Sequence, residues 1–260
     1  MNKLRLRRIF APDGRTVIVA LDHAVYFGPL AGLERPGKVI EQVVAAGADA
    51  VLTTAGVAAR FGERLGRAGL ILRADGGGTV RDPQPAGPRP ILSIERALRL
   101  GADGLACMGM IGSPHESASL QLLSELVDEC GRWGLLVLAE MLVQGRGGGE
   151  LTAEDVAFTV RVGAELGADL IKTSYVGPPE AYRAAVAACY VPVVVLGGEK
   201  FEHERLLLEA VAGALEAGVA GVAIGRNIWR HRDPAGMTRA LVALVHGGAT
   251  VDQAWKEILG

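Results

Sequence analysis

The stretch ELGADLIKTS (165–174) decides the fold, because its pattern recurs along the chain. Three other stretches share this pattern: AAGADAVLTT (45–54), RLGADGLACM (99–108) and EAGVAGVAIG (216–225). In each copy a helix end is followed by a glycine, two short residues and an apolar run typical of a strand buried on both faces. The glycine stands where a helix C-terminus favours a left-handed residue. The four glycines are 54, 66 and 51 residues apart, which is the length of two strand–helix units.

Further strands and helices lie between the repeats. The strands expected there are TVIVALD (16–22), LILRA (70–74), LLVLAEM (135–141) and VPVVVLGG (191–198). Helical periodicity covers 38–46, 116–132, 153–166, 179–188, 203–217 and 235–245. Eight alternating strands predict an α/β protein, a single (β/α)8 TIM barrel that forms one domain over residues 1–260. The alternative, an open doubly wound sheet, would need a glycine-rich phosphate fingerprint after its first strand, and the sequence has none.

Composition excludes several classes of function. The 27 Lys and Arg against 29 Asp and Glu give a formal charge of −2, so the chain lacks the basic surface that nucleic acids need. No uninterrupted apolar stretch is long enough to span a membrane. The three cysteines are far apart and in no CxxC spacing, which favours the reducing cytoplasm. No glycine motif indicates a nucleotide, so we expect no cofactor.

Lys172 is the strongest catalytic candidate. Only five of the 27 cationic residues are lysines, and Lys172 lies within the apolar strand DLIKTSY. Strand alternation places Leu170, Lys172 and Ser174 on one face, which points into the mouth of the predicted barrel. A desolvated amine there has a lowered pKa and can attack a carbonyl to form a Schiff base. The alternative is a lysine whose stem packs while its head reaches solvent or a carboxylate.

Asp22 and His23 end the first strand. A carboxylate at the end of an apolar strand is costly to bury unless it is paired, so Asp22 could pair with Lys172 and shuttle protons. Alternatively, Asp22 caps the following turn. We interpret His23 as a residue that orients the loop rather than as a catalyst.

Two glycine-rich stretches, LGGEK (196–200) and IGRNIWR (224–230), follow the last two strands. The N–H groups of Gly197, Gly198 and Gly225, with Arg226 at the start of a short helix, predict a phosphate site where this fold recurrently has one. Each glycine taken alone would indicate only a turn. The glycine tract 145–149 is compatible with a mobile lid or with a flexible connection that has no function of its own. The glycine tract 74–79 would allow the backbone to approach a ligand closely. The histidines have no paired ligand spacing, so we expect no metal site.

These residues lie in motifs of a known family. The motifs are DH…GP in VIVALDHAVYFGPLAG (17–32), KTSY in GAELGADLIKTSYVG (163–177), and AGVAGVAIGRNIWRHRDP (217–234). The chain resembles the archaeal-type class I fructose-bisphosphate aldolase (DhnA-type) family, above all its 2-amino-3,7-dideoxy-D-threo-hept-6-ulosonate synthase branch. The resemblance implies a homo-oligomeric aldolase or transaldolase with a Lys172 Schiff base and Asp22 in acid–base steps. It also implies that the substrate phosphate is bound by Gly197, Gly198, Gly225 and Arg226.

The chain departs from the family at two positions. Leu142 stands where the family usually has an acid–base tyrosine, so another group must transfer the proton. Glu140, two residues earlier on the same strand face, is the nearest substitute, and Tyr26 and Tyr175 remain alternatives. Phe27 replaces a histidine common in fructose-bisphosphate members. This disfavours simple glycolytic cleavage and is compatible with joining dihydroxyacetone phosphate to an amino-acid semialdehyde.

We therefore expect a metal-independent class I aldolase or transaldolase that forms or cleaves a C–C bond in a phosphorylated ketose. One alternative is a phosphosugar isomerase or epimerase with a carboxylate base. The other is a catalytically altered phosphosugar-binding protein, which the leucine at position 142 makes conceivable.

Overall fold

Eight parallel strands close into a barrel in the structure, a computed structural model that describes residues 4–84, 87–143, 150–199, 201 and 203–259. The strands are β1 (Thr16–Ala20), β2 (Ala50–Thr53), β3 (Gly69–Arg73), β6 (Gly104–Ile111), β7 (Leu136–Val143), β8 (Leu170–Thr173), β9 (Val193–Leu196) and β10 (Gly221–Ile224). Pairing of β1 with β10, for example Val17 opposite Val222, closes the ring. The predicted (β/α)8 barrel is confirmed.

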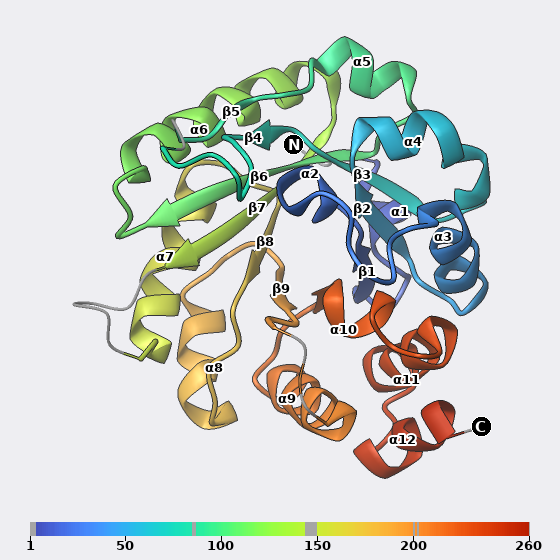
Figure 1. Cartoon of the computed structure of the whole chain (residues 1–260). Helices are drawn as coiled ribbons and strands as arrows, with labels where there is room; N and C mark the ends of the chain where they lie inside the picture. Colours follow the sequence, from blue (N-terminus) through green and yellow to red (C-terminus); the bar gives the residue numbers. More distant parts are fainter. Residues whose placement is uncertain (1–3, 85–86, 144–149, 200, 202, 260) are drawn as a thin grey trace.

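Helices enclose the strands, as Figure 1 shows. They are α3 (Pro36–Ala45), α4 (Ala55–Phe61), α5 (Ile94–Arg99), α6 (Glu116–Trp133), α7 (Ala153–Glu165), α8 (Pro179–Ala187), α9 (Glu204–Glu216) and α11 (Pro234–Val245). The 3-10 turn η1 (Gly62–Leu65) follows α4, and α12 (Val251–Leu259) packs on α11. The six helices expected from periodicity lie within two residues of their expected bounds. Among the described residues, no helix has the length and apolar character needed to cross a membrane.

The glycines of the repeat have the predicted conformation. Their φ angles are +99°, +77°, +91° and +102° for Gly47, Gly101, Gly167 and Gly218. At such angles a side chain would collide with its own backbone, which is why glycine recurs here. The four residues end α3, α5, α7 and α9 and turn the chain toward the next strand.

The helix α1 (Leu6–Ile9) closes the amino-terminal end of the barrel. Ile9 is buried in the same cluster as the interior residues Ile18, Ile71 and Leu138. The Ile9 carbonyl accepts a hydrogen bond of 2.6 Å from the Thr16 hydroxyl at the start of β1. Apolar side chains thus fill this end of the barrel, and polar residues occupy its carboxyl-terminal end.

Two short elements cover that carboxyl-terminal end. The helix α2 (Ala24–Phe27) follows β1, and a hairpin of β4 (Asp75–Gly76) and β5 (Arg89–Pro90) follows β3. The Tyr26 hydroxyl of α2 donates a 2.9 Å hydrogen bond to the Asp75 carbonyl, so the two elements are joined. The glycine tract 74–79 therefore lies beside the barrel mouth, where it was expected to allow close approach.

His246 links two carboxylates next to the start of the barrel. Its Nδ1 lies 2.7 Å from Asp13 Oδ2, and its Nε2 lies 2.9 Å from Asp49 Oδ2. Burial alone would lower the pKa of His246, but both carboxylates raise it above its ordinary value. A folded-state pKa above the unfolded one means that the stabilisation is complete below about pH 6.5 and is lost as the pH rises through the folded-state pKa.

We therefore expect the free energy of unfolding to fall from about pH 6 to about pH 9, by about 1 kcal/mol or less through His246, because solvent screens this partly exposed cluster. His246→Gln keeps hydrogen-bonding atoms but carries no charge, so it should lack this part of the pH dependence. Urea unfolding of both proteins across the pH range measures the difference. A difference that stays constant with pH would contradict the assignment.

Candidate active site

Four charged side chains are buried together at the carboxyl-terminal end of the barrel. Asp22, Arg73, Glu140 and Lys172 are 4%, 1%, 7% and 4% exposed. They come from four segments: the end of β3, the interior of β7 and β8, and the loop after β1. Strand alternation explains their direction, because apolar residues two positions earlier, such as Leu138 for Glu140, belong to the barrel interior. The inward face predicted for Lys172 is confirmed.

Lys172 and Glu140 face each other across β7 and β8. The two residues are register partners, and Lys172 Nζ lies 2.5 Å from Glu140 Oε1. Burial alone would raise the pKa of Glu140, but the Lys172 ammonium and the Arg73 guanidinium together hold it well below its ordinary value. Glu140 is therefore a carboxylate in direct contact with the candidate nucleophile. This contact is what an acid–base partner of Lys172 requires, and the substitution of Glu140 for the family tyrosine stays a prediction.

Arg73 is the site residue that the sequence reasoning missed. Its Nε and Nη2 lie 2.8 and 2.7 Å from Asp22 Oδ2, and Nη2 also contacts Glu140 Oε2. Asp22 thus pairs with Arg73 rather than directly with Lys172 as expected. The same alternation that singled out Lys172 could have found Arg73, since it follows Ile71 on the inner face of an apolar strand.

A cavity of about 340 Å³ opens above these side chains. Leu142, Phe27 and Ser174 line one part of it, and Leu196, Glu199 and Arg226 line another. Arg226 therefore reaches the same cavity as Lys172. This volume is sufficient for a small phosphorylated sugar and places a cation within the space that holds the candidate nucleophile.

The predicted phosphate glycines follow the neighbouring strands β9 and β10. A Cβ on Gly225 would lie 2.5 Å from His23 Cε1, so no side chain fits there. A Cβ on Gly197 would lie 2.9 Å from Ile224 Cγ2, and Gly198 has a left-handed φ of +62°. Gly197 and Gly225 are buried against these neighbours, whereas Gly198 is half-buried beside open space. The three glycines are not among the residues that line the cavity, and their role in binding phosphate stays a prediction.

Arg226 and Asn227 organise the loop after β9. Arg226 contacts the Glu199 carboxylate, and its Nε is buried without a hydrogen-bond partner within the described part of the chain. Asn227 Nδ2 donates to the Gly197 and Glu199 carbonyls at 2.9 and 3.1 Å. The Asn227 amide was not singled out from the sequence, because only the tertiary structure brings the two loops together. An unpaired guanidinium N–H is a ready donor for an anion.

The aromatic candidates have different positions. Tyr26 lines the cavity, but its hydroxyl donates to the Asp75 carbonyl, and burial raises its pKa. Tyr175 instead packs edge-on against Tyr182, with ring centroids 4.8 Å apart, and is not among the residues that line the cavity. Glu140, unlike either tyrosine, contacts Lys172 directly, and its role as the substitute stays a prediction.

His23 packs against the ring of Trp229, with ring centroids 5.5 Å apart, and its Nδ1 lies 3.6 Å from Asp22 Oδ1. Burial lowers the pKa of His23, which favours the neutral ring. A neutral ring packed between Trp229 and the Gly225 backbone fits the expected loop-orienting role.

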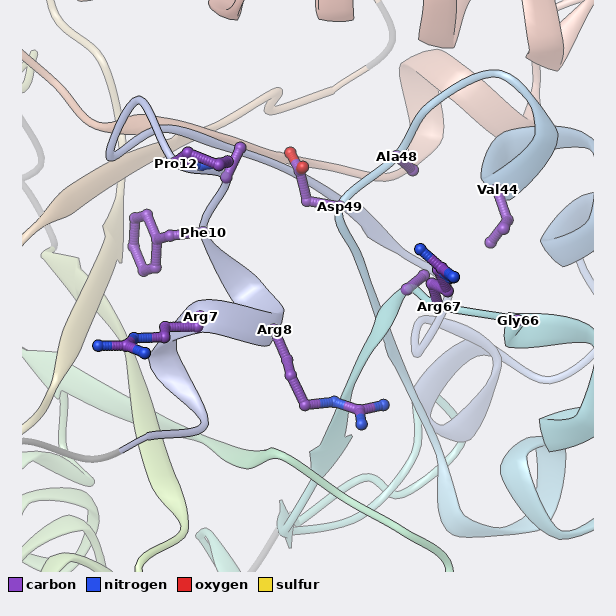
Figure 2. Close-up of a pocket in the computed structure, with 11 residues that line it drawn as sticks. Arg7, Arg8, Phe10, Pro12, Val44, Ala48, Asp49, Gly66 and Arg67 are labelled. Atoms are coloured by element: carbon purple, nitrogen blue, oxygen red, sulfur yellow. The ribbon is translucent and has the colours of Figure 1, made fainter.

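A larger cavity of about 570 Å³ lies at the opposite end of the barrel (Figure 2). Phe10 and Pro12 line one side of it, and Val44, Ala48 and Arg67 line the other. These residues precede or connect the starts of strands, away from Lys172. The chemistry of this fold takes place at the carboxyl-terminal ends of strands, so this cavity is not the candidate active site.

Some expectations fall on residues that are not described. The tract 145–149 and Lys200 lie outside the described residues. Within the described residues, no three His, Cys, Asp or Glu side chains are grouped so that they could hold a metal ion. The expectation of a metal-independent reaction stays a prediction.

A (β/α)8 barrel with a buried lysine beside a carboxylate at its catalytic end defines a class of enzymes that act through a lysine amine. Residues 16–231 match the DeoC/LacD family of aldolases. The chain is 36% identical to 2-amino-3,7-dideoxy-D-threo-hept-6-ulosonate synthase of Halobacterium salinarum, over 96% of this chain and 93% of that one. It is 34% identical to 2-amino-4,5-dihydroxy-6-oxo-7-(phosphonooxy)heptanoate synthase of Streptomyces griseus, over 96% and 92%.

The fold comparison agrees. An archaeal fructose-1,6-bisphosphate aldolase, solved with its catalytic lysine covalently bound to the carbinolamine intermediate, matches with a TM-score of 0.82 and 31% identity, over 93% of this chain and 98% of that one. The chain belongs to the DeoC/LacD aldolase family. It is a class I aldolase, which acts through a lysine Schiff base. The isomerase and binding-protein alternatives are therefore set aside.

Proposed function

We propose that this aldolase is biosynthetic: Lys172 forms a Schiff base with a phosphorylated ketone such as dihydroxyacetone phosphate, which is then joined to an amino-acid semialdehyde. The observation that carries the proposal is the shared cavity. Both the Lys172–Glu140 pair and Arg226 line it. A donor anchored by its phosphate at Arg226 would have its ketone held near Lys172. Such positioning lowers the barrier without taking part in the bond changes.

The acceptor follows from the chemistry of a relative's product. The Streptomyces griseus synthase is named for a heptanoate with an amino group at carbon 2, hydroxyls at 4 and 5, a ketone at 6 and a phosphate ester at 7. In this β-hydroxyketone, aldol cleavage separates carbons 4 and 5. The two fragments are dihydroxyacetone phosphate and a four-carbon amino-acid semialdehyde. By analogy we assign this pair of substrates to the present chain.

The site residues can be placed in a sequence of steps. Glu140 takes a proton from the Lys172 ammonium, and the free amine attacks the ketone carbon. The former ketone oxygen takes up a proton from the attached nitrogen, and Glu140 then returns its proton to the resulting hydroxyl, which leaves as water and gives the iminium. Asp22 removes a proton from the carbon beside the iminium, which gives an enamine. That carbon then attacks the aldehyde, whose oxygen takes the proton that Asp22 holds, and water hydrolyses the new iminium to release the product ketone and the Lys172 amine. Each transfer uses a carboxylate buried beside the reacting atoms.

The setting of this activity also remains a proposal. The sequence favours a cytoplasmic, homo-oligomeric enzyme of one domain, with a small-molecule substrate and no nucleic-acid or membrane partner. Neither a metal nor a cofactor has a part in the proposed steps, since the iminium itself withdraws the electrons.

Borohydride trapping tests the proposal. With dihydroxyacetone phosphate, reduction of the iminium should leave a stable secondary amine on Lys172, found by peptide mass mapping. Unphosphorylated dihydroxyacetone at the same concentration should give far less adduct. In Arg226→Met, half-maximal trapping should need about 10-fold more donor, because a charge-assisted hydrogen bond is worth about 1.5–3 kcal/mol.

Two controls show whether trapping depends on Lys172 and on the choice of donor. Lys38 on α3 is exposed, and Lys38→Met should trap donor as the wild-type protein does. If no wild-type adduct forms with any of several phosphorylated ketones, the assigned substrate class and the role of Lys172 are wrong.

A further inference from the structure

Arg73 has no step in the mechanism above, yet it touches three carboxylates of the site. Besides Asp22 and Glu140, its Nη1 lies 3.2 Å from Asp75 Oδ1. A guanidinium has five donors in a rigid plane and can hold several carboxylates at once, which an ammonium on a flexible stem does less well. At 1% exposure, the side chain has no solvent to replace these partners.

The hairpin holds Arg73 in place through Asp75 of β4. Asp75 Oδ2 accepts a 3.1 Å hydrogen bond from the Met108 amide, and the Asp75 carbonyl accepts from the Tyr26 hydroxyl. Asp75 is 2% exposed, so this anchor is part of the interior. A continuous set of contacts thus runs from the hairpin through Arg73 to the carboxylates beside Lys172.

The charges explain why the arrangement persists. Three buried carboxylates, Asp22, Asp75 and Glu140, face two buried cations, Arg73 and Lys172. Without a cation, the buried carboxylates would either become protonated or repel one another and move apart, since burial of an uncompensated charge is costly. Burial alone would lower the pKa of Arg73, but the three carboxylates raise it well above its ordinary value.

We propose that Arg73 is a positioning residue whose Nε and Nη2 atoms hold the Asp22 and Glu140 carboxylates in place, so that Glu140 can serve the amine of Lys172 and Asp22 the carbon beside the iminium. The inference rests on the proposed function, because these carboxylates have a task only if Lys172 forms the Schiff base. It goes beyond that function in assigning a residue of β3, together with its Asp75 anchor, to the control of the acid–base pair.

The test is chemical rescue of Arg73→Ala. We expect kcat to fall about 100-fold, as for other groups that orient catalytic residues, while the KM for dihydroxyacetone phosphate stays within about threefold because Arg226 is intact. Guanidinium chloride far below denaturing concentrations should restore part of kcat by filling the space left by the side chain. Sodium chloride and urea at matched concentrations should not.

The pH profile gives a second readout. The charged and titratable groups around Glu140 are Lys172 on β8, Arg73 on β3, Asp22 and His23 after β1, Tyr26 on α2 and Asp75 on the hairpin. Arg73→Ala removes one of the two cations that lower the pKa of Glu140. The acidic limb of kcat should therefore move to higher pH in this variant, and guanidinium should move it back.

Arg73→Lys keeps the positive charge but loses the planar set of guanidinium donors, so the variant should still fold. Its kcat should be about 10-fold lower, and the acidic limb of its pH profile should stay near that of the wild type. Wild-type kcat in a folded Arg73→Ala or Arg73→Lys protein would overturn the inference, as would a folded alanine variant that guanidinium does not rescue. If the alanine variant does not fold, the kcat of the lysine variant tests the inference by itself. Wild-type trapping on Lys172 is measured in parallel, so that failure of the proposed function is seen separately.

Discussion

Lys172→Met should retain less than about one-thousandth of the wild-type aldol activity, because the reaction loses its covalent intermediate. Methionine has nearly the length of the lysine stem and packs in the same interior. The fold should survive the change, since Glu140 keeps its contact with Arg73. The measurements are kcat/KM for condensation with dihydroxyacetone phosphate and the thermal midpoint of unfolding.

The loss should also be specific to this lysine. Lys172→Met should give no borohydride adduct, whereas the exposed Lys38→Met should give the wild-type amount. If Lys172→Met kept more than about a tenth of wild-type kcat with intact folding, the amine would not be the nucleophile. A carboxylate mechanism of the isomerase type would then have to be reconsidered for this member of the family.

Glu140→Gln should lower kcat by about 10²–10⁴, the range that positioned acid–base groups contribute. Glutamine preserves the shape of the side chain and can still accept a hydrogen bond from Lys172, but it cannot exchange protons. It also leaves Lys172 and Arg73 buried without the carboxylate that both contact. Steady-state kinetics should show the loss in kcat, with a smaller change in the KM of the phosphorylated donor, whose proposed anchor is Arg226.

Position 142 offers a matched pair of controls. Leu142 lines the same cavity two residues beyond Glu140, at the position where the sequence resemblance implies a tyrosine. In the Glu140→Gln background, Leu142→Tyr should recover part of kcat, and Leu142→Phe, which lacks only the hydroxyl, should not. Equal recovery by both aromatic residues, or wild-type kcat in Glu140→Gln alone, would show that Glu140 is not the substitute for the tyrosine.

Most of the architecture was predictable because its signals are local. The recurring glycines need left-handed backbone wherever they occur, and their φ angles depend on the adjacent residues alone. The alternation around Lys172 likewise follows from strand geometry once an apolar strand is recognised. The same reasoning would have found Arg73, but 22 of the 27 cations are arginines, so an arginine carried no compositional signal.

The closure of the amino-terminal end was not predictable in the same way. The arginine-rich segment LRLRRIF (4–10) was not among the strands and helices expected from the sequence, yet Ile9 is 1% exposed and lies in the cluster of the barrel interior. Its burial depends on a space that exists only after the eight strands have closed. Tyr175 lies close to Lys172 in the sequence, which made it a candidate, but its ring packs against Tyr182 and it is not among the residues that line the cavity.

The sequence by itself determined the barrel, the inward face of Lys172 and the strand ends where a phosphate could be bound, because periodicity and turn geometry act between near neighbours. Only the tertiary structure decided which charges meet. Arg73 lies 51 residues from Asp22 and 67 from Glu140 along the chain, and their contacts depend on strand order, register and barrel closure. These are set by packing of the whole barrel, so the partner of each buried charge became known only when the strands were in place.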